Sequence, residues 1–209
     1  AIRRLRTPEF YGASKGSSCA TTIVGDAKCG SRYCAGYSSA HPAFKIMEIN
    51  GKTKLTGIIG YPLTYTISPQ LHNAAFDALG LNMRYVPMVV RPESLPAAVA
   101  GLAALGFIGV NVTMPHKEAV MRYLDLVDPE AKAIGAVNTI AIRAGEMVGY
   151  NTDGRGFLEA LVEKGISPTG LRAVVIGAGG AARAVIASLA RVGCEVAVFN
   201  RTSSRAEEL

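Results

Sequence analysis

The apolar positions from residue 54 onward form short continuous runs separated by stretches with helical spacing, whereas residues 1 to 46 show neither pattern. Apolar runs predict strands at residues 55–59, 85–90 and 108–112, and helical spacing predicts helices at 68–80 and 94–105. The first helix has Ser68 as its predicted N-cap and Pro69 at its first position. This β-α-β-α-β alternation is typical of an open α/β sheet.

The next part of the chain predicts shorter elements. We expect helices at residues 118–124, 129–134 and 154–164, and strands at 139–143 and 147–150 on either side of a turn. Residues 168–170 form a predicted turn, where we place a domain boundary. The sequence therefore predicts an open mixed α/β domain over residues 47–167 and the start of a second domain over 168–209.

A glycine-rich turn lies between two predicted strands, at residues 173–176 and 196–199. Gly177 permits a tight turn, Gly179 lets the backbone approach a pyrophosphate, and Ala182 is small enough for a helix to pack on the strand. The N–H groups of the following helix then face the phosphates. This pattern predicts the first βαβ unit of a Rossmann fold, with a plain strand-turn-helix connection as the alternative. The predicted cofactor-binding residues of this turn are Gly177, Ala178, Gly179, Gly180 and Ala181.

The end of the second strand indicates which dinucleotide is bound. An NAD site has Asp or Glu here to bind the ribose 2′-OH, but this chain has Asn200, Arg201, Thr202 and Arg205. Two cations and a hydroxyl suit a 2′-phosphate, so we predict that the cofactor is NADP. The alternative is that the two arginines are the solvated start of a helix.

Composition adds bounds on class and location. The chain has 209 residues, 49% of them hydrophobic and 18% charged, as expected of an ordinary soluble α/β protein. Residues 1 to 46 contain seven Lys or Arg and two acidic residues, so five of the six net positive charges lie there. We therefore expect no binding of nucleic acid by the folded part. No apolar run approaches the length of a membrane span, so we expect no membrane partner either.

The two ends of the chain carry separate expectations. We expect residues 1 to 46 to be a disordered extension, and their composition fits equally a transit peptide, with a plastid location, or an extension before a start at Met47. Without such a peptide we expect a cytoplasmic protein. Cys29, Cys34 and His41 lack paired metal-ligand spacing, so we predict no metal site. A dinucleotide fold needs about six strands, so we expect this chain to be truncated at its C-terminus.

Three polar clusters follow predicted strands, where open α/β sheets bind ligands. The first has hydroxyls ahead of a helix, which suit a carboxylate. Taken singly, each cluster also has an explanation as a helix cap or a turn. Their members are Thr64, Thr66 and Ser68, then Asn111, Thr113 and Lys117, and finally Asn138, Thr139, Asn151, Thr152 and Asp153.

Six motifs, in this order, resemble the shikimate dehydrogenase family. They are TISPQLHN at 66–73, NVTMPHK at 111–117, GAVNT at 135–139, NTDG at 151–154, GAGGAAR at 177–183 and NRT at 200–202. The resemblance implies the NADPH-dependent, reversible reduction of 3-dehydroshikimate to shikimate, in the pathway to aromatic amino acids. It also implies a small-molecule partner and a monomer or homodimer.

The resemblance makes Lys117 and Asp153 the catalytic pair. It implies that the substrate is bound by Thr66, Ser68, Asn111, Thr113, Lys117, Asn138 and Asp153. The family usually has Ser at position 66, so the methyl group of Thr66 leaves the choice between shikimate and quinate open. His72 is expected to pack within its helix and His116 to lie in a turn.

Two alternatives remain at this stage. One is a quinate/shikimate dehydrogenase that prefers NAD, against which the cations near residue 201 argue. The other is a non-catalytic NADP-binding regulator, against which the presence of both Lys117 and Asp153 argues, because sensing a nucleotide needs neither.

Overall fold

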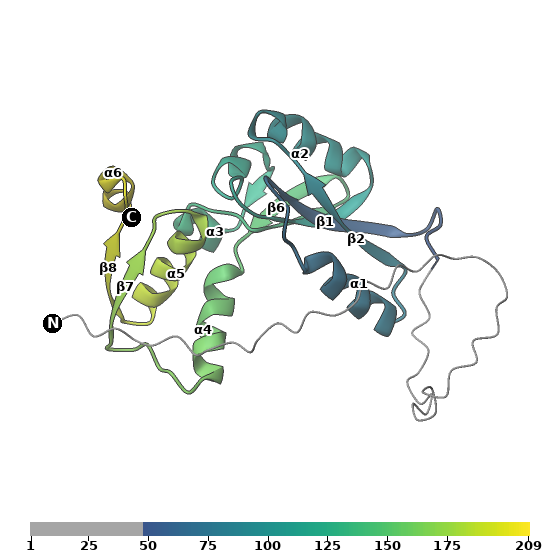
Figure 1. Ribbon diagram of the computed structural model, residues 1–209. Coiled ribbons are helices and arrows are strands. Elements are labelled where there is room, and N and C mark those ends of the chain that lie inside the picture. The colour runs from purple at the N-terminus through teal and green to yellow at the C-terminus, as the bar shows by residue number, and fades with distance from the viewer. Residues whose placement is uncertain (1–47) are drawn as a thin grey trace, which may run out of the picture. The chain divides into compact units, whose positions relative to one another are not determined.

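The computed structural model describes residues 48–209 (Figure 1). The expectations for residues 1 to 46, including those for Cys29, Cys34 and His41, lie outside the described residues. Within residues 48–209, no helix is both long and apolar enough to cross a membrane.

The first sheet has six strands in the order β2-β1-β3-β5-β6-β4. Strand β1 is central to its parallel half and pairs with β2 and β3, whereas β5 is antiparallel to both β3 and β6. The strand bounds are β1 Lys54–Gly60, β2 Met83–Val89, β3 Phe107–Val112, β4 Leu126–Val127, β5 Thr139–Arg143 and β6 Glu146–Tyr150. This arrangement confirms the predicted open, mixed α/β sheet.

Helices cover both faces of this sheet. Helix α1 (Ser68–Ala78) and helix α2 (Leu95–Ala104), which follows the 3-10 turn η1 (Pro92–Ser94), lie on opposite sides of β1 and β2 (Figure 1). The main core forms where α2 meets the sheet, because α2 is apolar on most of its surface and buries Leu95, Val99 and Leu102. The central strands contribute Ile59 and Ile140, both without exposed surface. Burial of such side chains contributes about 1.5 to 3 kcal/mol each.

Two sequence predictions need correction, and one strand was missed. Ser68 is not the N-cap of α1, because Ile67 already has helical backbone angles and Ser68 is the first helical residue. Residues 118–124 form a short 3-10 helix, η2 (Ala119–Tyr123), in place of the predicted helix. Strand β4 was not predicted, because two residues are too short for any periodic pattern. Helix α3 (Pro129–Ile134) begins and ends as predicted, with the side chain of Asp128 as its N-cap.

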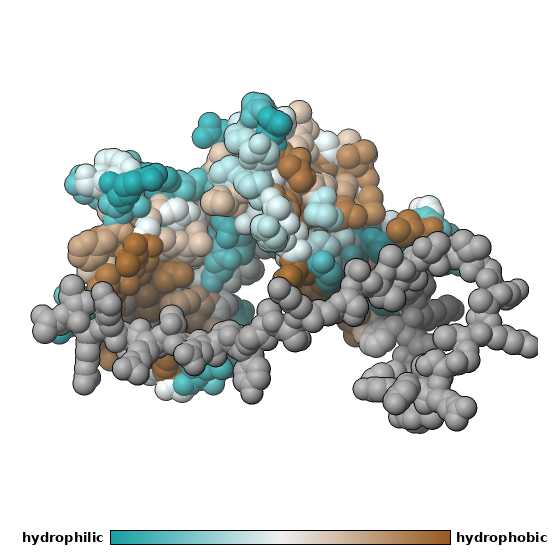
Figure 2. Space-filling model, viewed as in Figure 1, coloured by the Kyte–Doolittle hydropathy of each residue, from teal (hydrophilic) through white to brown (hydrophobic). Residues whose placement is uncertain are grey.

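The last part of the chain is a βαβ unit. Strands β7 (Arg172–Ile176) and β8 (Glu195–Phe199) are parallel, with helix α5 (Gly180–Arg191) between them in the chain and helix α6 (Ser203–Glu207) after them. This confirms the predicted strand-turn-helix-strand unit. Apolar surface gathers over the region of β7 and α5 in Figure 2, and the strands expose Val174, Ile176 and Phe199. One face of the small sheet therefore remains open to solvent.

Helix α4 (Asp153–Glu163) packs against α5 at a glycine. A Cβ atom at Gly154 would overlap the Ser188 Oγ atom and lie 2.8 Å from the carbonyl oxygen of Ala184. The two helices can approach this closely only because position 154 has no side chain. The contact matters for the site, because Asp153 is the residue before this glycine.

We predict that Gly154→Ala destabilises the protein by about 1 to 3 kcal/mol, the usual cost of overpacking. Gly156→Ala is the matched control on the same helix, because a Cβ atom there meets nothing within 4 Å. An exposed helical Gly→Ala change should stabilise by about 0.5 to 1 kcal/mol. Chemical denaturation of both variants measures the difference, and equal free energies of unfolding would contradict the close helix contact.

Candidate functional site

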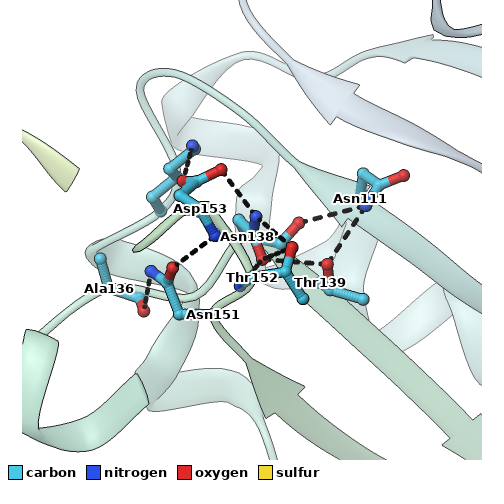
Figure 3. A network of polar contacts seen from close by, with 8 residues as sticks. Asn111, Ala136, Asn138, Thr139, Asn151, Thr152 and Asp153 are labelled. Carbon is cyan, nitrogen blue, oxygen red and sulfur yellow. Dashed lines mark hydrogen bonds and ion pairs between the residues drawn. The ribbon is translucent and has the colours of Figure 1, made fainter. Parts of the chain in front are cut away.

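The carboxylate of Asp153 is the centre of a network of polar side chains (Figure 3). Asp153 begins α4, and its backbone N–H donates to Asn151 Oδ1 over 3.0 Å. Asn151 in turn donates to the carbonyl oxygen of Ala136 over 2.9 Å. These bonds tie the start of α4 to the segment before β5, so the position of the carboxylate is set by two separate parts of the chain.

Lys117 forms an ion pair with Asp153. Its Nζ atom lies 2.5 Å from Asp153 Oδ2, and both side chains are largely buried. Lys117 follows the turn after β3, and its carbonyl oxygen accepts a hydrogen bond from the N–H of Val137 over 2.8 Å. A charge that is partly shielded from water costs free energy unless it is paired, and the ion pair offsets part of that cost for both side chains.

Asn138 holds the other oxygen of the carboxylate. Its Nδ2 atom donates to Asp153 Oδ1 over 2.8 Å and to Thr152 Oγ1 over 2.9 Å. Its Oδ1 atom accepts from the Thr139 hydroxyl over 2.9 Å and from the N–H of Thr152 over 3.0 Å. Both amide hydrogens of Asn138 are therefore engaged within the protein, and its direct effect in this arrangement is to orient Asp153.

The network continues across the sheet to a tyrosine that the sequence did not single out. Asn111 on β3 lies opposite Thr139 on β5, and its Nδ2 atom donates to Thr139 Oγ1 over 3.2 Å. The hydroxyl of Tyr85 on β2 donates to Asn111 Oδ1 over 2.8 Å. Tyr85 lay within an apolar strand pattern, where a tyrosine is ordinary, so no local signal marked it. Only the pairing of distant strands places it here.

The first polar cluster joins the network at Tyr85. Burial raises the pKa of the Tyr85 phenol to about 12, although a hydrogen bond with the Ser68 side chain acts in the opposite direction. Thr66 Oγ1 accepts from the backbone N–H of Ser68 over 3.3 Å. Thr113 lies elsewhere, in the wall of a cavity that Lys117 also lines. Thr64 is exposed.

The two histidines within the motifs have structural contacts. His116 is 1% exposed, and its Nε2 atom donates to the carbonyl oxygen of Val90 over 2.7 Å, so it joins the turn after β3 to the end of β2. His72 has its ring stacked on that of Tyr85 with 4.2 Å between centroids, and its Nδ1 atom lies 2.9 Å from the Ser68 carbonyl oxygen. His116 is more than the predicted turn residue, because its side chain is buried and bonded.

A cavity of about 790 Å³ adjoins Lys117 and the glycine turn. Helix α5 begins at Gly180, with the extended Gly179 as N-cap, no side-chain capping bond and no acidic residue in its first turn. Gly177 has φ +121°, which favours glycine, and a Cβ atom at Gly180 would lie 2.8 Å from Lys117 Cβ. An uncapped helix N-terminus facing a cavity fits a phosphate group, so these residues suit a dinucleotide.

The residues predicted to select NADP lie after β8. Arg201 and Thr202 are exposed, and Asn200 Nδ2 donates to the carbonyl oxygen of Thr202 over 2.8 Å. Arg205, which also lines the cavity, donates to both carboxylate oxygens of Glu118, over 2.9 and 3.0 Å. Glu118 follows Lys117 directly, so this pair joins the end of the βαβ unit to the segment that carries the lysine.

Among residues 48–209, no group of three or more His, Cys, Asp or Glu side chains is placed to hold a metal ion.

Comparison with known proteins identifies two family domains in this chain. Residues 58–140 match the shikimate dehydrogenase substrate binding domain, and residues 160–209 match the shikimate / quinate 5-dehydrogenase domain. A curated relative, the shikimate dehydrogenase (NADP(+)) of Carboxydothermus hydrogenoformans, is 56% identical over 163 residues. That alignment covers 78% of this chain and 58% of the relative, so the chain spans little more than half the relative's length.

Solved structures agree with this result. A shikimate dehydrogenase in complex with NADP+ is 49% identical, with a TM-score of 0.72 over 77% of this chain and 56% of that one. The shikimate 5-dehydrogenase of Thermus thermophilus in complex with shikimate is 43% identical, with a TM-score of 0.70 over 75% of this chain and 60% of that one. From its two domain matches and these relatives, the chain belongs to the shikimate dehydrogenase family.

Proposed function

We propose that this chain carries the substrate site and the start of the cofactor site of an NADP-dependent shikimate dehydrogenase. The Lys117–Asp153 ion pair beside the cavity is the observation that carries the proposal, because it places a proton donor next to a site suited to a dinucleotide. The curated relatives named as shikimate dehydrogenases (NADP(+)) support the same reaction. In this proposal residues 47–167 bind the substrate and residues 168–209 begin the NADP-binding domain.

The proposed reaction is the reversible reduction of 3-dehydroshikimate to shikimate. NADPH, when bound at the glycine turn of residues 177–181, would supply the hydride. The ammonium group of Lys117 stabilises the negative charge that develops on the substrate oxygen and donates a proton to that oxygen. In the reverse direction, neutral Lys117 accepts the proton of the substrate hydroxyl.

Asp153 has a positioning role in this mechanism. One carboxylate oxygen holds Lys117 and the other is held by Asn138, so moving the lysine away would leave a partly buried charge without its partner. Ser68, Asn111 and Thr113, together with Thr66 and Asn138, are proposed to bind the substrate's carboxylate and hydroxyls. Asn138 would have to exchange one of its present bonds to do so.

The proposed function predicts a steady-state preference and a defect in one variant. The complete gene product should oxidise shikimate with NADP faster than quinate with NADP, and faster than shikimate with NAD.

Lys117→Ala should lower kcat by about 10² to 10⁴, the usual contribution of acid-base catalysis, with little change in KM. Lys164→Ala, an exposed residue at the end of α4, is the control and should behave as wild type. Near-normal kcat in Lys117→Ala would place the chemistry on another residue.

Cofactor choice gives a separate prediction. Arg201→Asp removes a cation proposed to bind the 2′-phosphate and supplies an acceptor for a 2′-OH, so preference should shift from NADP toward NAD. The loss of one charge-assisted contact corresponds to about 1.5 to 3 kcal/mol, or roughly tenfold to over a hundredfold in affinity for NADP. Titration of wild type and of the variant with NADP and with NAD measures all four affinities. Unchanged NADP affinity would exclude Arg201 from the phosphate site.

A further inference from the structure

Tyr85 is held in place on three sides. Its backbone N–H donates to Asn73 Oδ1 over 2.8 Å, and its carbonyl oxygen accepts from Asn73 Nδ2 over 3.0 Å. Its ring stacks on His72, and its hydroxyl donates to Asn111. The residue is 4% exposed. The backbone bonds fix the position of the residue and the stacking restrains its ring, so the hydroxyl is held beside Asn111.

Tyr85 and Asp153 are connected by a series of hydrogen bonds, and in each of them the donor is the group nearer to Tyr85. Tyr85 donates to Asn111, and Asn111 donates to Thr139. Thr139 donates to Asn138, which donates to Asp153. An amide oxygen only accepts and an amide nitrogen only donates, so the orientation of each asparagine depends on the group before it. Lys117 reaches the same carboxylate from the other side.

We propose that Tyr85 is a positioning residue for substrate binding, which fixes the side-chain amide of Asn111 in one orientation and, through Thr139 and Asn138, supports the placing of Asp153. This inference rests on the proposed function, since it names how one of the proposed substrate ligands is oriented. Without the phenol, Asn111 Oδ1 loses its donor, so the amide is held only by the bonds that its Nδ2 atom donates to Thr139 Oγ1 and to the carbonyl oxygen of Asn138. A rotated amide would place its oxygen toward the Thr139 hydroxyl, and Thr139 would then donate to Asn111 and no longer to Asn138.

The chemistry of the phenol suits this role. The group must stay protonated to donate, and its pKa of about 12 keeps it protonated over the whole range in which such an enzyme works. The face of the sheet around it is the face that α1 covers, and a cavity of about 250 Å³ there is lined by Tyr85, Asn111 and Thr139, among others. Tyr85 therefore lines a cavity beside Asn111, which is proposed to bind the substrate. Tyr85 itself is not proposed to contact the substrate.

The test uses Tyr85→Phe in the complete gene product, which keeps the ring and its stacking on His72. KM for shikimate should rise by about fivefold to thirtyfold, the effect expected for one hydrogen bond of a buried network. kcat should fall less, and the dissociation constant for NADP should not change. Tyr123→Phe is the matched control and should keep wild-type constants, because the Tyr123 side chain packs against the apolar core.

A double-mutant cycle separates positioning from a general structural effect. In the Asn111→Ala background, Tyr85→Phe should cause no further rise in KM, because its partner is already absent. Equal effects of Tyr85→Phe with and without Asn111 would overturn the proposal. Thr139→Val, which removes the next hydroxyl of the network, should shift KM in the same direction and provides the test if Tyr85→Phe does not fold.

A spectroscopic readout keeps this inference separate from the proposed function. The side-chain amide signals of Asn111 and Asn138 should shift in the nuclear magnetic resonance spectrum of Tyr85→Phe and stay in place in Tyr123→Phe. If wild type fails to oxidise shikimate but these signals shift, the proposed function fails while the orienting role of Tyr85 stands. If wild type is active but the signals and KM do not change in Tyr85→Phe, the positioning role is excluded.

Discussion

The partly buried carboxylate of Asp153 is the constraint around which the rest of the site is built. A carboxylate removed from water must be paired and hydrogen-bonded, and here Lys117 pairs with one oxygen and Asn138 donates to the other. The three residues come from a turn after β3, the segment before β5 and the start of α4. The Asp153 carboxylate has both of its partners only when these three segments are in place, so the polar site depends on how they pack together.

Close backbone approaches bring the βαβ unit of β7, α5 and β8 to this site. Gly154 lets α4 and α5 cross at the residue after Asp153, and Gly180 leaves room for Lys117 beside the start of α5. The pair of Glu118 and Arg205 spans the same cavity. Two glycines that leave no room for a side chain, Gly154 and Gly180, therefore bring Lys117, Asp153 and the N-terminus of α5 together as much as the attractive contacts do.

Much of this arrangement could be predicted from local sequence. The periodicity of the hydrophobic residues predicted the longer strands, the longer helices and the βαβ unit. The polar residues at strand ends indicated where a site would form. Local sequence could not show that Ile67 already has helical angles, or that a pair of residues forms β4. It also could not show Tyr85, because that role depends on β2, β3 and β5 belonging to one sheet. Pairings between distant segments decide such contacts, and no periodic signal reports them.

A kinetic double-mutant cycle shows whether Lys117 and Asp153 act as one catalytic unit, as the proposed mechanism requires. The measurement compares kcat for reduction of 3-dehydroshikimate by wild type, Lys117→Ala, Asp153→Asn and the double variant of the complete gene product. Residues that act as one unit have non-additive effects. If Lys117 and Asp153 act as one unit, the double variant should be little slower than the slower single variant. Penalties that multiply in the double variant would show that the two residues act independently, against the proposed mechanism.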